Sequence, residues 1–176
     1  MSTNIVVTFT GKDRVGLVDQ VTQMLLDRDG NIEASRMAHL GGEFAMLMLV
    51  TLPAEQFANL ERDAAQWDKQ GYKVTLTHTA EAHTHAPANT LPFHIEVQGA
   101  DHEGIVHEVA HYLAQRGINI EEMTTATNPA PITGQPLFSM NALVAVPANM
   151  ANEWETALDQ LAQHLNVDIH ATPEKR

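Results

Sequence analysis

The sequence contains no cysteine, few aromatic residues and an excess of acidic over basic side chains. Without cysteine, neither disulfide bonds nor thiolate metal ligands are available. Because aromatic residues make up only 5% of the chain, Leu, Val, Ile, Ala and Met must fill any core. The 10 Lys and Arg residues stand against 22 Asp and Glu residues, which gives a formal net charge of −12.

Basic residues are especially scarce in the second half of the chain. Residues 1–88 carry 7 Lys and Arg against 11 Asp and Glu, whereas residues 89–176 carry 3 against 11. Direct binding to nucleic acid needs clustered cations that displace phosphate counterions, and no such cluster occurs here. We therefore expect no direct contact with nucleic acid or with an anionic membrane. Any regulatory role would act through a protein or small-molecule partner.

Long hydrophobic runs are also missing. No stretch approaches the roughly 18 apolar residues of a membrane span. Lys12, Asp13 and Arg14 interrupt the N-terminal apolar segment before it could serve as a signal sequence. These features predict a soluble, cytoplasmic protein.

The segment HEVAH, residues 107–111, fits the H-E-x-x-H pattern of zinc peptidases. At about 100° per residue, however, His107, Glu108 and His111 fall away from the apolar stripe that contains Val106, Val109, Ala110 and Leu113. No third ligand follows at a recognisable spacing. A solvent-facing helix surface is therefore the favoured interpretation, and no metal site is predicted.

The chain contains an internal repeat. The segment GKDRVGLVDQVTQMLLDRDGNIE (11–33) aligns with GADHEGIVHEVAHYLAQRGINIE (99–121) at a constant offset of 88 residues. Further on, FAMLMLVTLP (44–53) aligns with FSMNALVAVP (138–147) at an offset of 94. The second copy therefore carries six extra residues in or near 127–136.

Each copy predicts the element order βαββαβ. A β-rich segment ends at glycine, an amphipathic helix follows, a hairpin turns at Gly41-Gly42 in the first copy, and a second helix and a last strand close the unit. The predicted fold class is α+β, with two ferredoxin-like modules, each an antiparallel sheet with its helices on one face. The expected domains are residues 1–80 and 93–176, joined by a linker at 81–92.

The run Met46-Leu47-Met48-Leu49-Val50 places apolar residues on both faces of its strand. This pattern predicts burial on both sides, and hence packing between modules or between subunits. A homodimer is one arrangement that would provide it.

The repeated loop between the first strand and the first helix is the candidate binding element. A glycine lets the backbone approach a ligand closely, and a helix N-terminus offers free N–H groups to a carboxylate. Asp13 can alternatively cap those same N–H groups. Asn31 and Asn119 precede the second strand of each copy, where an Asn either binds an amino acid or accommodates a turn.

These motifs resemble the ACT domain, a small-molecule-sensing module. The resemblance rests on D-x-x-G-[L/I]-V after the first strand, on N-I-E before the second, and on the βαββαβ order in both copies. The stretch 13–50 is similar to the glycine cleavage system transcriptional repressor family, tandem ACT proteins of bacteria. In place of the proline that usually precedes the loop glycine in such domains, this chain has Val15 or Glu103.

The resemblance implies a site for a small amino acid, with glycine as the candidate, between the loop of one module and the second strand of its neighbour. It implicates Asp13, Arg14, Val15, Gly16, Leu17 and Asn31, with second-copy counterparts Asp101, His102, Glu103, Gly104, Ile105 and Asn119. The family also implies a non-enzymatic repressor without a cofactor, which controls a transcription activator by direct contact.

Two alternatives from other classes stay open. An ACT pair can act as a ligand-free interaction or oligomerisation module. An enzyme is the other, either a zinc hydrolase that uses HEVAH or a relative of the formyltetrahydrofolate deformylases. The deformylases begin with a similar module, but a second ACT copy here occupies the place of their catalytic domain.

Overall fold

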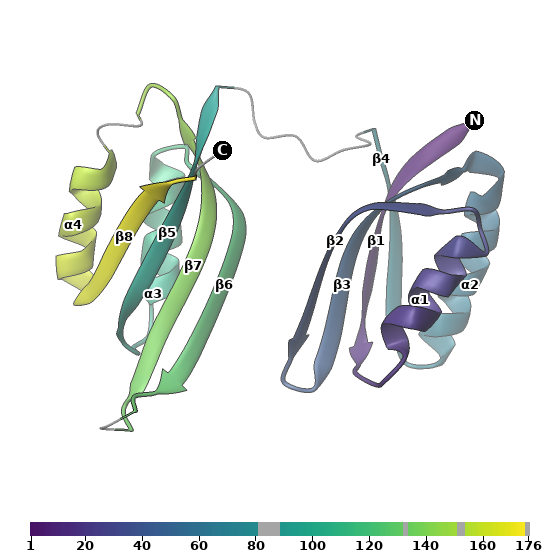
Figure 1. Cartoon of the computed structure of the whole chain (residues 1–176), viewed down its shortest axis with the longest axis horizontal. Coiled ribbons are helices and arrows are strands. Elements are labelled where there is room, and N and C mark those ends of the chain that lie inside the picture. The colour runs from purple at the N-terminus through teal and green to yellow at the C-terminus, as the bar shows by residue number, and fades with distance from the viewer. Residues whose placement is uncertain (81–88, 132–133, 151–153, 175–176) are drawn as a thin grey trace. The chain divides into compact units, whose positions relative to one another are not determined.

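The computed structural model describes residues 1–80, 89–131, 134–150 and 154–174. The chain divides into two compact units, Met1–His85 and Ala86–Arg176 (Figure 1). Most of the predicted linker, 81–92, lies outside the described residues, and its last three residues belong to a strand of the second unit. In the part of the chain that the structure describes, no helix is long and apolar enough to span a membrane.

The first unit has the predicted βαββαβ order, with a short 3₁₀ turn before its second helix. Its sheet is antiparallel, with strand order β2-β3-β1-β4. Figure 1 shows both helices on one side of this sheet. The elements are β1 (Ser2–Lys12), α1 (Leu17–Leu26), β2 (Asn31–Leu40), β3 (Glu43–Pro53), η1 (Ala54–Gln56), α2 (Phe57–Lys69) and β4 (Lys73–Thr79).

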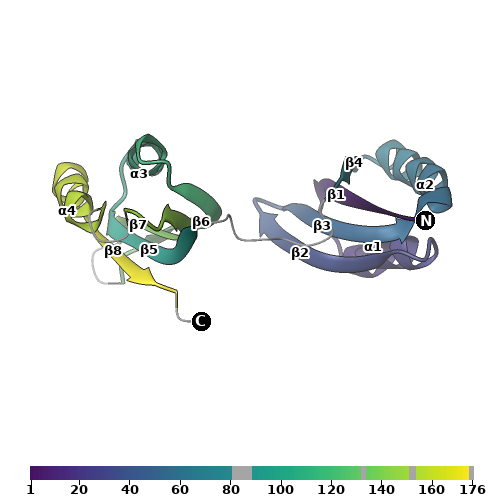
Figure 2. The same ribbon diagram turned by 90° about the horizontal axis from the view of Figure 1, so that it is seen from above.

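The second unit repeats this architecture. Its antiparallel sheet has the order β6-β7-β5-β8, and Figure 2 shows both helices on the same face of the sheet. The predicted tandem ferredoxin-like fold is therefore confirmed. The elements are β5 (Thr90–Ala100), α3 (Ile105–Gln115), β6 (Asn119–Pro129), β7 (Pro136–Pro147), α4 (Trp154–Leu165) and β8 (Val167–Pro173).

Each core lies between a sheet and its helices. Every second residue of the central strands points towards the helices, as in Ile5, Val7 and Phe9 of β1, which are fully buried. The helices contribute residues spaced three or four apart, because these share one helix face. The helix residues buried in this way are Leu17, Val21, Met24 and Leu25 on α1, and Ile105, Val109, Tyr112 and Leu113 on α3.

The hairpins differ between the units in the way the repeat predicts. In the first unit, Gly41 and Gly42 join β2 to β3 with φ angles of 60° and 87°. Two consecutive positive φ angles are typical of the two-residue hairpin turn that glycine favours. In the second unit, residues 130–135 join β6 to β7, and each of these strands is one residue longer than β2 and β3, so the six extra residues are divided between the connection and the two strands.

Strand β3 has one buried and one partly exposed face within its unit. Met46, Met48 and Val50 face the helices and are buried, but Leu47 on the opposite face is 50% exposed and Leu49 is half-buried. Burial of the second face would need another module or subunit, so that part stays a prediction. The pattern reflects a sheet whose outer face carries apolar side chains at the surface.

Candidate functional site

The two predicted binding loops enter their helices in the same way. Gly16 and Gly104 are the N-cap residues, with φ angles of 82° and 96° in the left-handed region. Neither helix receives a side-chain capping hydrogen bond at this end. The alternative in which Asp13 caps α1 is therefore wrong, because the helix begins three residues later than that arrangement needs. The first-turn N–H groups are left without a side-chain acceptor.

The aspartate of each loop instead ties the loop to the hairpin beside it. The Asp13 N–H donates to the carbonyl of Gly42 at 3.2 Å, and its carboxylate lies 3.7 Å from Nε2 of His39 on β2. In the second unit, the Asp101 N–H donates to the carbonyl of Pro136 at 3.0 Å. The Thr127 hydroxyl on β6 donates to the Asp101 carboxylate at 3.3 Å.

Thr127 and His39 therefore occupy equivalent places, since they pair with Phe138 and Phe44 respectively. Neither residue was among the predicted site residues. Their numbers differ by 88, so extending the offset of the first aligned block from 11–33 to His39 would have revealed the correspondence.

Arg14 turns towards its own second helix. Its Nε donates to the Tyr72 hydroxyl at 2.9 Å, and a terminal nitrogen donates to the Gln20 side chain at 2.6 Å. The guanidinium carbon also lies 5.9 Å from the ring centres of Trp67 and Tyr72. Arg14 thus anchors the first loop to the end of α2 and is not directed at an open site.

His102, its counterpart in the second unit, makes an analogous contact by different chemistry. Its Nε2 lies 2.8 Å from the carbonyl oxygen of Leu165, the last residue of α4. Its Nδ1 lies 3.1 Å from the carbonyl oxygen of Glu103. These two hydrogen bonds, led by the one to Leu165, raise the pKa of His102 above its ordinary value.

The remaining loop residues divide into exposed and core positions. Val15 is fully exposed at 102%, and Glu103 is exposed as well. Leu17 and Ile105, each 1% exposed, are the first residues of their helices and pack into the cores. They hold the loops in place.

Asn31 and Asn119 lie far from the loops of their own units. Asn31 pairs with Thr51, which pairs with Asn4, whereas the loop follows Lys12. Eight strand residues separate these levels, from 4 to 12, or roughly 27 Å at about 3.4 Å per residue. In the second unit, Asn119 pairs with Ala145, which pairs with Pro92, whereas the loop follows Ala100. Asn119 is therefore equally far from the second loop.

Neither asparagine is therefore brought together with its own loop within a unit. The Asn31 side-chain amide donates to Glu33 at 2.9 Å. Both strands shift register next to the asparagine, between Ile32 and Ala34 in β2 and between Ile120 and Glu122 in β6.

An open pocket of about 510 Å³ lies beside the second loop. Its apolar wall includes Phe138 and Val106, and its polar groups include the Asp101 carboxylate and Thr127. Four of the predicted site residues line it, together with five residues from α3 and the hairpin strands. The nine lining residues are Asp101, His102, Gly104, Ile105, Val106, His107, Ala110, Thr127 and Phe138. We call this the β5–α3 pocket.

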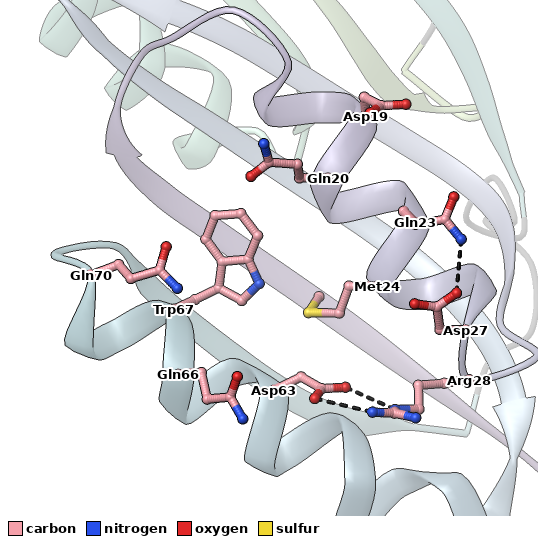
Figure 3. A pocket seen from close by; sticks show the side chains of 10 residues that line it. All are labelled: Asp19, Gln20, Gln23, Met24, Asp27, Arg28, Asp63, Gln66, Trp67 and Gln70. Carbon is pink, nitrogen blue, oxygen red and sulfur yellow. Dashed lines mark hydrogen bonds and ion pairs between the residues drawn. The ribbon is translucent and has the colours of Figure 1, made fainter.

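A second hollow, of about 380 Å³, lies between α1 and α2 of the first unit (Figure 3). Trp67 and Met24 stand between the two helices, and acidic and amide side chains surround them. Two pairs of these polar groups bond to each other, and Gln23 donates to Asp27 at 2.7 Å in one of them. Arg28 forms a two-pronged ion pair with Asp63 at 2.8 and 3.1 Å, which raises the pKa of the guanidinium, chiefly through the hydrogen bond itself.

The HEVAH segment forms part of α3, and its histidines face solvent. His107 and His111 are both exposed, and their rings stack with centres 5.8 Å apart. The Gln115 side chain lies 2.8 Å from Nε2 of His111. Among the described residues, no group of three or more His, Cys, Asp or Glu side chains could hold a metal ion. Val106 is 39% exposed and so does not belong to the buried stripe in which the sequence placed it.

Comparison with known proteins supports the predicted class. Residues 3–75 match the model of the ACT domain. A crystal structure of an unknown protein from Galdieria sulphuraria is 35% identical and has a TM-score of 0.86, with 99% of this chain and 100% of that chain aligned. The second unit has the same topology as the matched one. The first unit is thus an ACT domain, and the second unit repeats its fold.

Within that class, the chain resembles the glycine cleavage system transcriptional repressors. It is 28% identical to the repressors of Escherichia coli K12 and Shigella flexneri, across 92% of this chain and 85% of each relative. A structure provisionally described as such a repressor has a TM-score of 0.70 at 22% identity, with 100% of this chain and 99% of that chain aligned. The predicted resemblance is therefore confirmed, and the class is a regulatory one.

Proposed function

We propose that this protein is a non-enzymatic regulator that senses a small amino acid and represses glycine cleavage genes through contact with a transcription activator. Glycine is the first candidate ligand, because the relatives that cover most of the chain are repressors of the glycine cleavage system. Such a repressor acts where transcription takes place, so the proposal includes a cytoplasmic location.

The observation that carries the sensing part is the β5–α3 pocket, in which four predicted site residues meet. The Asp101 carboxylate offers an ion pair to an ammonium group. The uncapped N-terminus of α3, at Gly104, offers N–H donors to a carboxylate. An α-amino acid carries both groups. In the family arrangement, Asn31 or Asn119 of a neighbouring module would complete such a site.

The acidic charge of the chain supports action through a protein partner. A net charge of −12 would repel the phosphate backbone of an operator. The expected route of repression is therefore a contact with the activator itself. Copurification of a tagged activator with the protein, with and without amino acid, tests this part. If the protein retards operator DNA in a gel without the activator, action through a protein partner is refuted.

The sensing part is tested by thermal unfolding with a panel of amino acids at millimolar concentration. A ligand at 100 times its dissociation constant stabilises the protein by about 2.7 kcal/mol. We expect a selective upward shift that Asp101→Asn abolishes, because this change keeps the shape but removes the charge. Asp168→Asn, on the exposed β8 strand, is the matched control and should keep the shift. A flat panel would refute amino-acid sensing.

A second function, as an interaction or oligomerisation module, is favoured by the apolar outer face of the first sheet. On this face, Leu49 lies between Val6 of β1 and Ala34 of β2, and the half-exposed Leu47 pairs with Arg36. Burial of such a patch against a second copy would stabilise a homodimer. Sedimentation of the wild-type protein and of Leu47→Gln tests it, since a dimer through this face should weaken in the variant. Equal masses for both proteins would argue against it.

A further inference from the structure

The His102 ring lies between two hydrogen-bond acceptors. Its Nε2 is 2.8 Å from the Leu165 carbonyl oxygen and its Nδ1 is 3.1 Å from the Glu103 carbonyl oxygen. A neutral imidazole carries one N–H and can donate to only one of these carbonyls, whereas an imidazolium carries two and donates to both. The arrangement therefore has its full set of hydrogen bonds only when His102 is protonated.

We propose that His102 is a positioning residue for the β5–α3 pocket, and that its imidazolium holds the loop by donating at once to the end of α4 and to the Glu103 carbonyl of the loop itself. When the ring loses a proton, its one remaining N–H bonds either Leu165 or Glu103, so one of the two contacts is lost and the loop loosens. Because Asp101 and Gly104 flank His102, the loosening displaces both groups that would bind an amino acid. The effect on ligand rests on the proposed function, whereas the effect on the loop does not.

The charges around His102 favour the imidazolium. Leu165 ends α4, and the carbonyls at a helix C-terminus carry partial negative charge. The carboxylates of Asp101 and Glu103 belong to the same loop. From the packed elements, His107 of α3 lines the same pocket and His164 precedes Leu165 on α4.

The pKa of His102 is raised chiefly by the two carbonyl hydrogen bonds; burial opposes them to a lesser degree, and the Asp101 charge adds the smallest contribution. For a raised pKa, the docking contribution is fully present below the ordinary histidine pKa of about 6.5. It is lost as the pH rises through the raised value. The pocket should therefore be formed at mildly acidic pH and loosened in alkaline solution.

The first unit provides an internal contrast. Arg14 occupies the position that corresponds to His102 and holds its loop through Tyr72 and Gln20. A guanidinium stays protonated throughout the physiological range. The Arg14 contacts of the first loop should therefore persist at every pH at which the second loop titrates.

The first experiment needs no ligand. An NMR titration of the full chain follows the His102 imidazole and the amides of Gly104 and Gly16. We expect the Gly104 amide to shift with the same midpoint as the His102 ring, above the ordinary histidine value, while Gly16 stays unchanged. In His102→Gln the Gly104 shift should disappear, and in His111→Gln, a control on the exposed side of α3 outside the pocket, it should persist.

The proposal is overturned if the chemical shift of the Gly104 amide does not change with pH, or changes with the midpoint of another group. A titration midpoint of the His102 ring at or below the ordinary histidine value also overturns it. His102→Arg provides a further check, because a permanent cation should keep the loop docked at high pH. If Gly104 still shifts in His102→Arg, the proton on His102 is not what holds the loop.

The second experiment measures the affinity for glycine or another stabilising amino acid at pH 6 and pH 8. Affinity should fall at pH 8 in the wild type but not in His102→Arg. Equal wild-type affinities at both pH values would overturn the link between His102 and the pocket. A panel without any ligand at either pH, with the loop titration intact, would refute amino-acid sensing and leave the positioning role of His102 in place.

Discussion

Replacement of Gly11 by alanine should destabilise the first unit through a single steric clash. Gly11 lies near the end of β1, directly under the ring of Tyr72. A Cβ atom on Gly11 would lie 2.4 Å from Cδ1 and 3.1 Å from Cε1 of that ring. Real Cβ atoms do not approach another carbon so closely, so the ring must move.

The ring has little room to move. Tyr72 packs against Phe9 and Trp67, with ring centres 5.1 and 5.2 Å away, and its hydroxyl accepts the hydrogen bond from Arg14. Overpacking a well-filled core by one methyl group costs about 1–3 kcal/mol. For a domain of 60 to 100 residues, each kcal/mol lowers Tm by roughly 4–8 °C. A displaced ring would also release Arg14 and with it the first loop.

Hydrogen exchange in urea, measured on peptides from each unit, reports this loss of stability separately for the two units. Gly11→Ala should weaken protection in the first unit only. Gly99→Ala is the corresponding change in the second unit, where a Cβ would lie 2.7 Å from Cγ1 and 3.1 Å from Cα of Val167. It should weaken the second unit only, and by at least as much, because backbone yields less readily than a ring.

The double variant Gly11→Ala/Tyr72→Ala separates the clash from other effects. Removal of the ring should make the glycine substitution nearly neutral, so the two single costs should not add. A stability change of less than about 0.5 kcal/mol in Gly11→Ala would place that substitution among ordinary surface changes. Such a result would refute the reasoning from ring contact.

Two further predictions concern single positions. Met48→Ala should lower the free energy of unfolding, measured in urea, by about 2–5 kcal/mol, as other buried Met-to-Ala changes do. Leu47→Ala on the exposed face should cost much less, and equal costs would contradict the assignment of the two faces. Dialysed protein should contain far less than one zinc per chain by elemental analysis, and Glu108→Gln should change nothing, because the HEVAH histidines face solvent; stoichiometric zinc that disappears in His107→Ala would reverse this conclusion.

The fold could be predicted because its signals are local and doubled. Alternating apolar residues, helix-spaced apolar residues and paired glycines each mark one element, and the repeat confirms the order. The burial predicted for Val106 was wrong, because Val106 adjoins the buried Ile105 but the rotation of the helix turns it outward. Leu47 lies on the face of β3 that nothing covers within its unit.

The site was less predictable because its contacts cross the fold. The sequence marks Arg14 and His102 as loop residues. It does not show that Arg14 contacts Tyr72, or that His102 contacts the Leu165 carbonyl, near the end of the second helix of each unit. Pairing of Asp101 with Thr127 depends on the packing of β6 beside the loop, which no local pattern in the sequence shows. The distance from Asn31 to the loop follows from antiparallel pairing, once it is clear that β2 begins at the opposite end of the sheet.

The duplication separates what the backbone requires from what the side chains supply. Both copies keep a left-handed glycine before the first helix and a glycine beneath a close neighbour on the first strand. Glycine is required at both positions for steric reasons that hold for any module with this backbone. The groups that hold each loop differ instead, with Arg14 in one unit and His102 in the other. The two loops therefore share a shape but not a chemistry, so a single amino acid should not occupy both with equal affinity or with the same dependence on pH.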